Sequence, residues 1–287
     1  MRVLYATDGS EAAIAAGDVL VASADRAEVD VTLLSVVPTG MPAVKHLSGA
    51  LRPEEDLREY AERVVAAGAA RLRDAGFTVE EEIAEGRPDN VITRTAEQTG
   101  TDLLVVGAGP RSVLVGRLLG SATTALLHGS TSMLVVRDAP AARPVNVVIG
   151  TDGSAHAGRA VELAATFLDP ERCGVTVVSV AVLIVATPEA PYGGYAITAP
   201  DESYEAVAGP AREHVEKAAG TLRARGFEPR TEVILGHPVK RLLGVAGDTD
   251  AALVVVGSRG LSNPDRAFLG SVSDQIVRQA PACLVAR

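Results

Sequence analysis

The sequence predicts an α/β protein of two tandem domains, each an open five-stranded parallel sheet with helices on both faces. Short apolar, β-branched runs alternate with longer amphipathic segments, which is typical of buried parallel strands joined by helices. The pattern occurs twice, because Thr7-Asp8-Gly9-Ser10 returns as Thr151-Asp152-Gly153-Ser154, 144 positions later. A chain of 287 residues is long enough for two domains that each bury a core.

In the first half we expect five strands and four helices in alternation. The strands are expected at 3–6, 31–37, 77–84, 103–106 and 132–137. The helices are expected at 11–24, 53–75, 89–99 and 121–128. Pro38 ends the second strand, Gly76 ends the long second helix, and the alternating polarity of 77–84 predicts a strand at an edge of the sheet.

The second half repeats this order. Its strands are expected near 147 and 175 and at 228–235, 253–256 and 282–286. The offset between the halves grows to 150 by Gly76-Phe77 and Gly226-Phe227, so six residues are inserted, and we expect them in the stretch 187–204, which is rich in Pro, Gly and Tyr. We therefore place domain 1 at 1–138, a linker with two prolines at 139–144, and domain 2 at 145–287.

The composition argues against several classes of function. The net charge of −9 and an aromatic content of 3% without Trp argue against nucleic-acid binding. The longest apolar run, 175–186, is shorter than the ~20 residues of a membrane span, and the first strand leaves no room for a signal peptide before it. We expect a cytoplasmic protein. Cys173 and Cys283 are not related by the repeat, so we expect neither a disulfide nor a metal site, and we place Cys283 in the core.

A glycine-rich loop after the strand 253–256 predicts an anion site. Gly257 and Gly260 follow the strand, and Gly270-Ser271 stand where the next helix begins. Glycine allows the backbone to approach a ligand closely, and the first amides of a helix have no acceptor within it, so phosphate is the expected ligand. A plain connection in which glycine supplies only turn geometry is the alternative.

Asp152 follows the first strand of domain 2. Ligands of open parallel sheets bind at the carboxyl ends of the strands, where the winding order reverses. If the strands near 147 and at 253–256 are neighbours, Asp152 faces the same crevice as the glycine loop and can accept hydrogen bonds from an adenine or a ribose. The alternative is that Asp8 and Asp152, with Ser10 and Ser154, only cap the helices that follow, and the pattern does not decide between the two.

These residues resemble the universal stress proteins of the UspA type, over both halves and nearly the whole chain. Members that bind ATP carry Gly-x2-Gly-x9-Gly-Ser or Gly-Thr after the fourth strand, an Asp after the first and an apolar last strand that ends in Arg. Gly257-x2-Gly260-x9-Gly270-Ser271 matches the loop, Asp152 matches the Asp, and 134–137 and 284–287 match the last strand. The resemblance implies two flavodoxin-like domains of the adenine nucleotide alpha hydrolase-like kind.

The resemblance also implies which residues hold the nucleotide. In domain 2 these are Asp152, the backbone of Val180, Gly257, Arg259, Gly260, Gly270, Ser271, Val272 and Ser273. Domain 1 departs from the motif, because Pro110 stands where the second glycine is expected and proline has no N–H to donate. A weakened site there comprises Asp8, Val36, Gly107, Gly109, Gly120, Ser121 and Thr123.

The function that the resemblance implies is an ATP-binding regulatory or sensory module of the stress response, with Mg²⁺ accompanying the nucleotide. It further suggests that the last strands of the two domains pair antiparallel as a pseudo-dimer within the chain, that two chains form a homodimer, and that an unknown protein partner is contacted. A slow ATP-hydrolysing enzyme with the same crevice and a nucleotide-free interaction scaffold are the alternatives.

Motifs of other enzyme classes are missing from the sequence. It contains no P-loop, no nucleophile elbow and no zinc-binding spacing, so we expect no catalytic residues and no metal ligands. His156 and His214 have no histidine at the repeat-related position, and we expect both on the surface or on helices.

Overall fold

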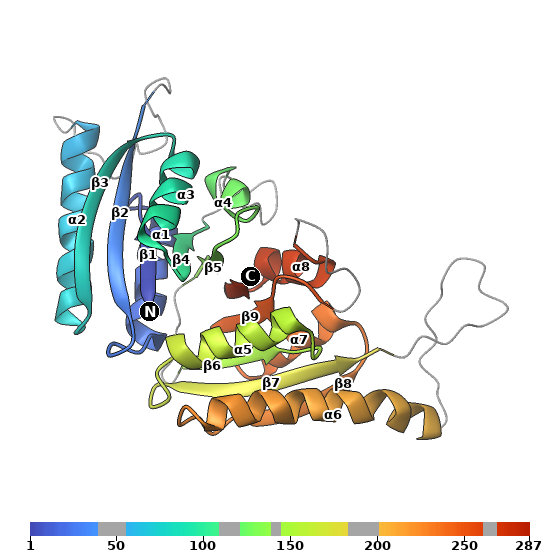
Figure 1. Cartoon of the computed structure of the whole chain (residues 1–287). Coiled ribbons are helices and arrows are strands. Elements are labelled where there is room, and N and C mark those ends of the chain that lie inside the picture. The colour runs from blue at the N-terminus through green and yellow to red at the C-terminus, as the bar shows by residue number, and fades with distance from the viewer. Residues whose placement is uncertain (40–55, 109–120, 139–144, 183–200, 261–268) are drawn as a thin grey trace, which may run out of the picture.

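The strands form one continuous sheet in the computed structural model, which describes residues 1–39, 56–108, 121–138, 145–182, 201–260 and 269–287. The first half contributes β1 (Arg2–Ala6), β2 (Asp30–Pro38), β3 (Thr78–Gly86), β4 (Leu103–Gly107) and β5 (Ser132–Val136). The second half contributes β6 (Val145–Gly150), β7 (Cys173–Ala181), β8 (Arg230–Leu235), β9 (Leu253–Gly257) and β10 (Ala282–Ala286). Their order in the sheet is β3-β2-β1-β4-β5-β10-β9-β6-β7-β8 (Figure 1).

Each half of the sheet is parallel, and the two halves meet in an antiparallel pair. Within a half the order is 3-2-1-4-5, which differs from the 2-1-3-4-5 order of flavodoxin itself. β5 and β10 pair antiparallel, with Leu134 opposite Leu284. The expected pseudo-dimer of the two domains within one chain is therefore confirmed, as is the doubly wound α/β fold.

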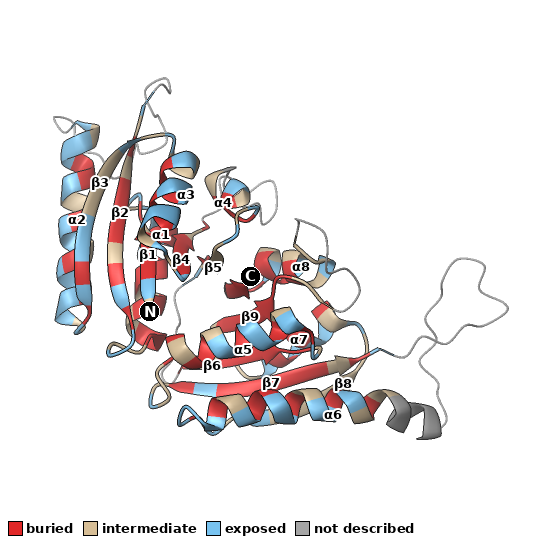
Figure 2. Ribbon diagram, viewed as in Figure 1, coloured by how far each residue is buried: buried red, intermediate tan, exposed pale blue. Residues whose placement is uncertain are grey.

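Helices cover both faces of the sheet. They are α1 (Glu11–Ser23), α2 (Leu57–Asp74), α3 (Pro88–Thr99), α4 (Ser121–Leu126), α5 (Ala155–Phe167), α6 (Asp201–Arg223), α7 (Pro238–Asp248) and α8 (Ser271–Gln279). One hydrophobic core lies under α1, α2, α5 and α6, and a second lies under α3, α4, α7 and α8. The inner strands between them are mostly buried, whereas the edge strands β3 and β8 are mainly half-buried or exposed (Figure 2).

Local sequence explains where the helices begin and end. Asp56 caps α2 and forms a capping box with Glu59, and Gly76, at φ +96°, follows the helix in the left-handed region. The expected start of this helix at 53–55 and most of the expected insertion at 187–204 lie outside the described residues. β3 lies at one edge of the sheet, as its alternating polarity predicts.

The two domains exchange contacts that the repeat relates to one another. Arg137 of domain 1 donates from Nη2 to the carbonyl oxygen of Val277 near the end of α8, at 3.0 Å, and Arg287 of domain 2 donates to that of Leu127 after α4. A second pair of bonds joins the ends of α1 and α5: Asp25 N donates to Phe167 O at 2.8 Å, and Asp169 N donates to Ser23 O at 2.9 Å. Cationic side chains at helix C-termini satisfy carbonyl groups that the helix leaves unpaired.

Both cysteines are buried. Cys283 has no exposed surface, as expected for a core residue, and burial raises the pKa of its thiol. Burial also raises the pKa of the Cys173 thiol to about 12. These thiols stay protonated at neutral pH and act as small apolar groups. None of the helices within the described residues is both long and apolar enough to cross a membrane.

Candidate functional site

The winding order of domain 2 reverses between β6 and β9. The two strands are parallel neighbours, with Val147 opposite Leu253 and Ile149 opposite Val255. β7 and β8 follow on one side of β6, and β10 follows β9 on the other. The Asp152 turn and the glycine loop therefore leave the sheet side by side, at the position where open α/β sheets bind ligands.

The turn after β6 is built by its own side chains. Thr151 Oγ1 accepts a hydrogen bond from Gly153 N at 3.3 Å, and Asp152 Oδ1 accepts one from Ser154 N at 3.0 Å. Gly153 has φ +76°, which favours glycine. Ser154 is the N-cap of α5, because its Oγ accepts from Ala157 N at 3.2 Å. One oxygen of Asp152 thus closes the turn, and Ser154 alone caps the helix.

The other oxygen of Asp152 lies against the glycine loop. A Cβ atom on Gly260 would lie 2.5 Å from Asp152 Oδ2, so only glycine fits at this position without a shift. Ser154 Oγ also reaches the loop and donates to Arg259 O at 3.4 Å. The structure therefore brings Asp152, Arg259 and Gly260 together, as the sequence analysis expects.

Gly257 has a packing role in addition to the ligand contact expected of it. A Cβ atom at this position would lie 2.6 Å from the carbonyl carbon of His156 and 2.7 Å from Ala157 N, both in the backbone of α5. Gly107 is in the same situation in domain 1, where a Cβ atom would lie 2.4 Å from the carbonyl carbon of Ala12. The missing side chain lets a helix pack closely on the end of the strand, so helix packing accounts for these two glycines.

The far end of the loop is fixed to the start of α8. Gly270 N donates to Ser258 O at 2.8 Å, and Ser273 Oγ donates to Gly257 O at 2.6 Å. Gly270 is the N-cap and offers no side-chain acceptor to the first amides of α8. Ser271 is exposed and Val272 half-buried. The helix therefore begins beside the loop with amides directed at any anion bound there.

Three arginines act on His156, whose backbone packs against Gly257 at the start of this loop. Burial lowers the pKa of His156, and Arg159, Arg259 and Arg287 lower it further, while Asp152 opposes them. Burial, followed by Arg259, also lowers the pKa of Arg287. These shifts report a positive potential beside the glycine loop, which favours a polyanionic ligand.

The loop also contains a buried hydroxyl that makes no hydrogen bond within the described residues. Ser258 is only 1% exposed, and its Oγ is without a partner there. Buried hydroxyl groups are rarely left unpaired in folded proteins. Ala108 stands at the repeat-related position of domain 1, so this hydroxyl belongs to domain 2 alone.

The crevice of domain 1 keeps the turn, but its fourth helix is bonded less closely to the fourth strand. Asp8 Oδ1 accepts from Ser10 N at 3.0 Å, and Gly9 has φ +72°, as in domain 2. Thr123 Oγ1, however, is 3.5 Å from Gly107 O, whereas the repeat-related Ser273 bond is 2.6 Å. α4, which begins at Ser121, has six residues where α8 has nine.

Domain 1 lacks two of the three arginines. Ala15 and Gly109 stand where domain 2 has Arg159 and Arg259, and Ala12 stands in place of His156, whereas Arg137 corresponds to Arg287. Gly109, Pro110 and Gly120 lie outside the described residues, as does part of the loop of domain 2 at 261–268. The two crevices therefore share the Asp turn and differ in electrostatics.

The remaining expected contacts lie at the ends of the second strands. Val180 in β7 is half-buried and pairs with Ile234, and Val36 in β2 is half-buried and pairs with Ala84. β6 separates β7 from β9, so Val180 lies across β6 from the glycine loop. This arrangement puts Val180 and Arg259 on opposite sides of Asp152.

Sequence reasoning missed the contribution of His156, Arg159 and Arg287. His156 and Arg159 occupy the first turn and a half of α5, directly after the Asp152 turn, and this closeness in sequence was the available signal. Arg287 is more than 130 positions from Asp152, and only the fold brings it near. The described residues contain no group of three or more His, Cys, Asp or Glu side chains that could hold a metal ion.

Comparison with known proteins gives a consistent result for both halves. The family model described as "Universal stress protein family" matches residues 1–137 and again 145–286. Universal stress protein MT2052 of Mycobacterium tuberculosis (strain CDC 1551 / Oshkosh) is 29% identical over 242 residues, which cover 80% of this chain and 71% of that protein.

Two solved structures extend the comparison. The crystal structure of a universal stress protein from Archaeoglobus fulgidus DSM 4304 has a TM-score of 0.67 at 20% identity and covers 100% of this chain and 98% of its own. This likeness supports the fold over the whole chain. A universal stress protein in complex with cAMP is 25% identical, with a TM-score of 0.35, and covers 50% of this chain and 97% of its own.

Proposed function

The chain belongs to the universal stress protein family, with one family unit in each half. From this premise we propose that domain 2 is an ATP-binding regulatory module of the stress response. One observation carries the proposal: the carboxylate of Asp152 lies against Gly260. A hydrogen-bond acceptor and a glycine loop are therefore side by side at the ends of β6 and β9, where the winding order of the sheet reverses. An adenylate needs both kinds of group, because its nucleoside offers donors and its phosphates require them.

The crevice of domain 2 suggests how the ligand is divided between its two sides. We place the nucleoside between Asp152 and the end of β7 at Val180, and the phosphates between Arg259 and the first amides of α8. Arg259, Arg159 and Arg287 supply the positive potential that three phosphates need. The hydroxyl of Ser258 is available as a further donor.

We propose that Mg²⁺ arrives with the nucleotide rather than occupying a protein site of its own. Magnesium is commonly bound through substrate phosphates and water together with one or two protein carboxylates. The described residues offer no cluster of three ligating side chains, and they fit this mode of binding.

We further propose that ATP acts as a signal and that its binding shifts domain 2 toward a conformation that a protein partner recognises. Binding without turnover distinguishes this role from that of a slow hydrolase. Phosphate release that falls in proportion to ATP affinity in an Asp152→Asn protein would instead favour the enzyme.

Replacement of Asp152 by Asn tests the site. The Asn side chain can still accept the hydrogen bond from Ser154 N, so the turn is retained while the carboxylate is lost. We expect ATP affinity, measured by titration calorimetry, to fall about tenfold or more, since a hydrogen bond to a charged group contributes about 1.5–3 kcal/mol. Asp8→Asn, at the repeat-related position, is the matched control and should bind as the unmodified protein does. Equal affinity in all three proteins would remove Asp152 from the site.

A further inference from the structure

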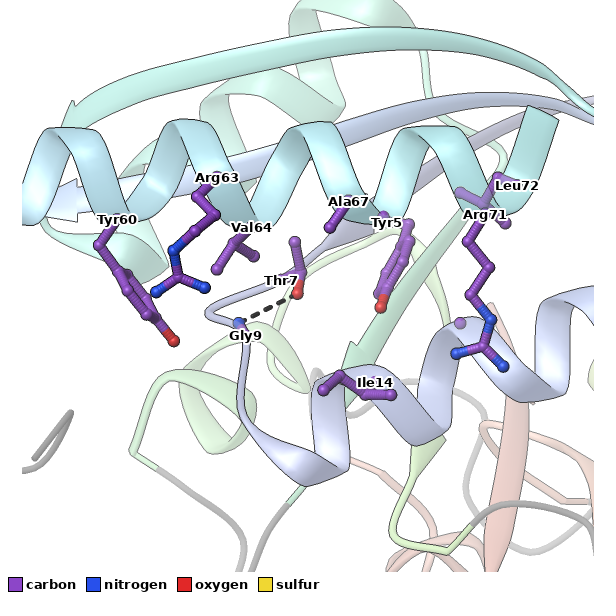
Figure 3. A pocket seen from close by; sticks show the side chains of 12 residues that line it. Tyr5, Thr7, Gly9, Ile14, Tyr60, Arg63, Val64, Ala67, Arg71 and Leu72 are labelled. Carbon is purple, nitrogen blue, oxygen red and sulfur yellow. Dashed lines mark hydrogen bonds between the residues drawn. The ribbon is translucent and has the colours of Figure 1, made fainter. Parts of the chain in front are cut away.

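Domain 1 contains a second cavity, on the opposite face of the sheet from α4. It has a volume of about 270 Å³ and lies between α1 and α2, bounded at one end by Thr7 and Gly9 (Figure 3). The helices beside it belong to the core under α1 and α2, whereas α4 belongs to the other core. The cavity is therefore distinct from the crevice between β1 and β4.

Glycines on the two facing helices leave this space open. A Cβ atom on Gly17 of α1 would lie 3.0 Å from the hydroxyl of Tyr5, and one on Gly68 of α2 would lie 3.0 Å from Leu33 Cδ2. The repeat-related residues in domain 2 are Val161 and Ala218. Larger side chains thus stand on both facing helices of domain 2 at these two positions.

The walls of the cavity are largely apolar and aromatic. Two of the five tyrosines of the chain, Tyr5 and Tyr60, line it together with Val64 and the fully buried Leu72. Ile14 stands at its edge with 47% of its surface exposed, and domain 2 has Gly158 at the related position. This side chain extends the apolar wall of the cavity to the protein surface, where a ligand can contact it.

Two arginines stand at the ends of the cavity. Figure 3 shows Arg63 at the end near Tyr60 and Arg71 at the end near Tyr5. The guanidinium group of Arg63 lies over the ring of Tyr60, 5.1 Å from its centroid, and Arg71 forms an ion pair with Asp18. Domain 2 has Glu213 and Thr221 at the related positions, so α2 carries positive charge here in a chain of net charge −9.

We infer that this cavity binds a small carboxylic acid with an aromatic or branched apolar body. The carboxylate pairs with Arg63, whose guanidinium group lies over the ring of Tyr60 and has the planar shape that suits a bidentate anion. The apolar body lies along Ile14, Val64 and Tyr5. A volume of about 270 Å³ is just below the ~300 Å³ at which drug-sized pockets begin, so the ligand is a metabolite-sized acid rather than a nucleotide.

The test uses 2-naphthoate as the probe and the full-length chain. Saturation-transfer NMR should show the naphthyl protons in contact with the protein, with a dissociation constant on the order of 1 mM or tighter. Arg63→Gln should weaken binding about tenfold, because it removes a charge-assisted hydrogen bond. Ala67→Phe should abolish binding, since Ala67 is an exposed lining residue and a ring there fills the cavity from its solvent side.

Matched controls come from the other domain and from the probe. Glu213→Gln and Lys217→Phe, at the repeat-related positions, should bind 2-naphthoate as the unmodified protein does. The neutral analogue 2-naphthalenemethanol should bind more weakly and be indifferent to Arg63→Gln. No saturation transfer to the unmodified protein, equal binding in both cavity variants, or displacement of the probe by ATP would each overturn the inference. Unfolding midpoints of all variants separate lost binding from lost folding.

Discussion

Gly153 and Gly257 are both glycines of the crevice, but for different physical reasons. Gly153 has φ +76° and lies under the imidazole of His214, which a Cβ atom would approach to 2.3 Å. Gly257 is required by the backbone of α5. The glycine motif attributes Gly257 to a ligand, and the structure adds a packing role that the pattern does not reveal, because a sequence pattern cannot distinguish a close approach to a helix from a close approach to a phosphate.

This account of Gly257 predicts the effect of adding a methyl group. Gly257→Ala should destabilise the protein by about 1–3 kcal/mol, because the new Cβ atom would lie 2.6 Å from backbone atoms that cannot rotate away. Gly158→Ala in α5 is the control: a Cβ atom there meets nothing within 4 Å, and the change should stabilise by about 0.5–1 kcal/mol. Urea unfolding measures both. A Gly257→Ala protein as stable as the parent would contradict the packing explanation.

His156 provides a reporter inside the domain 2 crevice. Burial and three arginines lower its pKa below the ordinary 6.5, so the ring is neutral at pH 7. The unfolded chain binds a proton at this histidine more readily than the folded chain does. The free energy of unfolding should therefore fall as the pH is lowered from about 6.5 toward the folded pKa of His156, and His156→Gln should remove that part of the pH dependence.

Bound ATP should raise the pKa of His156, since phosphates offset the arginines. An NMR titration of the imidazole that is unchanged by ATP would contradict the placement of the phosphates.

At the scale of elements, α8 connects the two domains. Its first turn adjoins the glycine loop of domain 2, and the carbonyl oxygen of Val277 near its last turn accepts from Arg137 of domain 1. The repeat-related bond from Arg287 to Leu127 O acts on α4 in the same way. The helices that follow the two glycine loops, α8 and α4, therefore each contact an arginine of the other domain near their C-terminal ends.

Removal of Arg137 should weaken this connection. Arg137→Met keeps much of the aliphatic volume and loses the charge-assisted bond to Val277 O, so we expect a loss of about 1–3 kcal/mol in the free energy of unfolding. Arg58→Met is the control: its ion pair with Glu85 is about half exposed, and its loss should stay within about 0.5 kcal/mol. Denaturant unfolding of both variants decides the matter, and a smaller loss for Arg137→Met than for Arg58→Met would go against this role.

At the scale of the whole molecule, antiparallel pairing of β5 with β10 turns two five-stranded sheets into one. That pairing covers an edge in each domain, and the outer edges that remain are β3 and β8. β3 carries Glu80, Glu81, Glu82 and Glu85, which discourages further strand pairing at that edge. The junction leaves the carboxyl ends of the strands of each domain available for its own crevice.

The sequence predicts most of this architecture but not its cross-domain contacts. Each strand was expected within a few residues of its observed bounds, because apolar runs such as Leu103–Gly107 are set by local pattern. Asp152 and Gly260 were expected to share a crevice, because the motif places both. The arginine exchange and the positive cluster were not expected, since they join residues up to 160 positions apart. The cavity between α1 and α2 also escaped prediction, because it depends on how far apart the two helices pack.

The central claim is that the two halves of the repeat have diverged, with the nucleotide site in domain 2. The most direct measurement is titration calorimetry of ATP with Mg²⁺ into nucleotide-free protein, read as the number of sites per chain. We predict one site, lost in Gly270→Val, where a branched side chain stands before the first amides of α8, and retained in the repeat-related Gly120→Val. Two equivalent sites per chain, or a single site lost in Gly120→Val and kept in Gly270→Val, would contradict the claim.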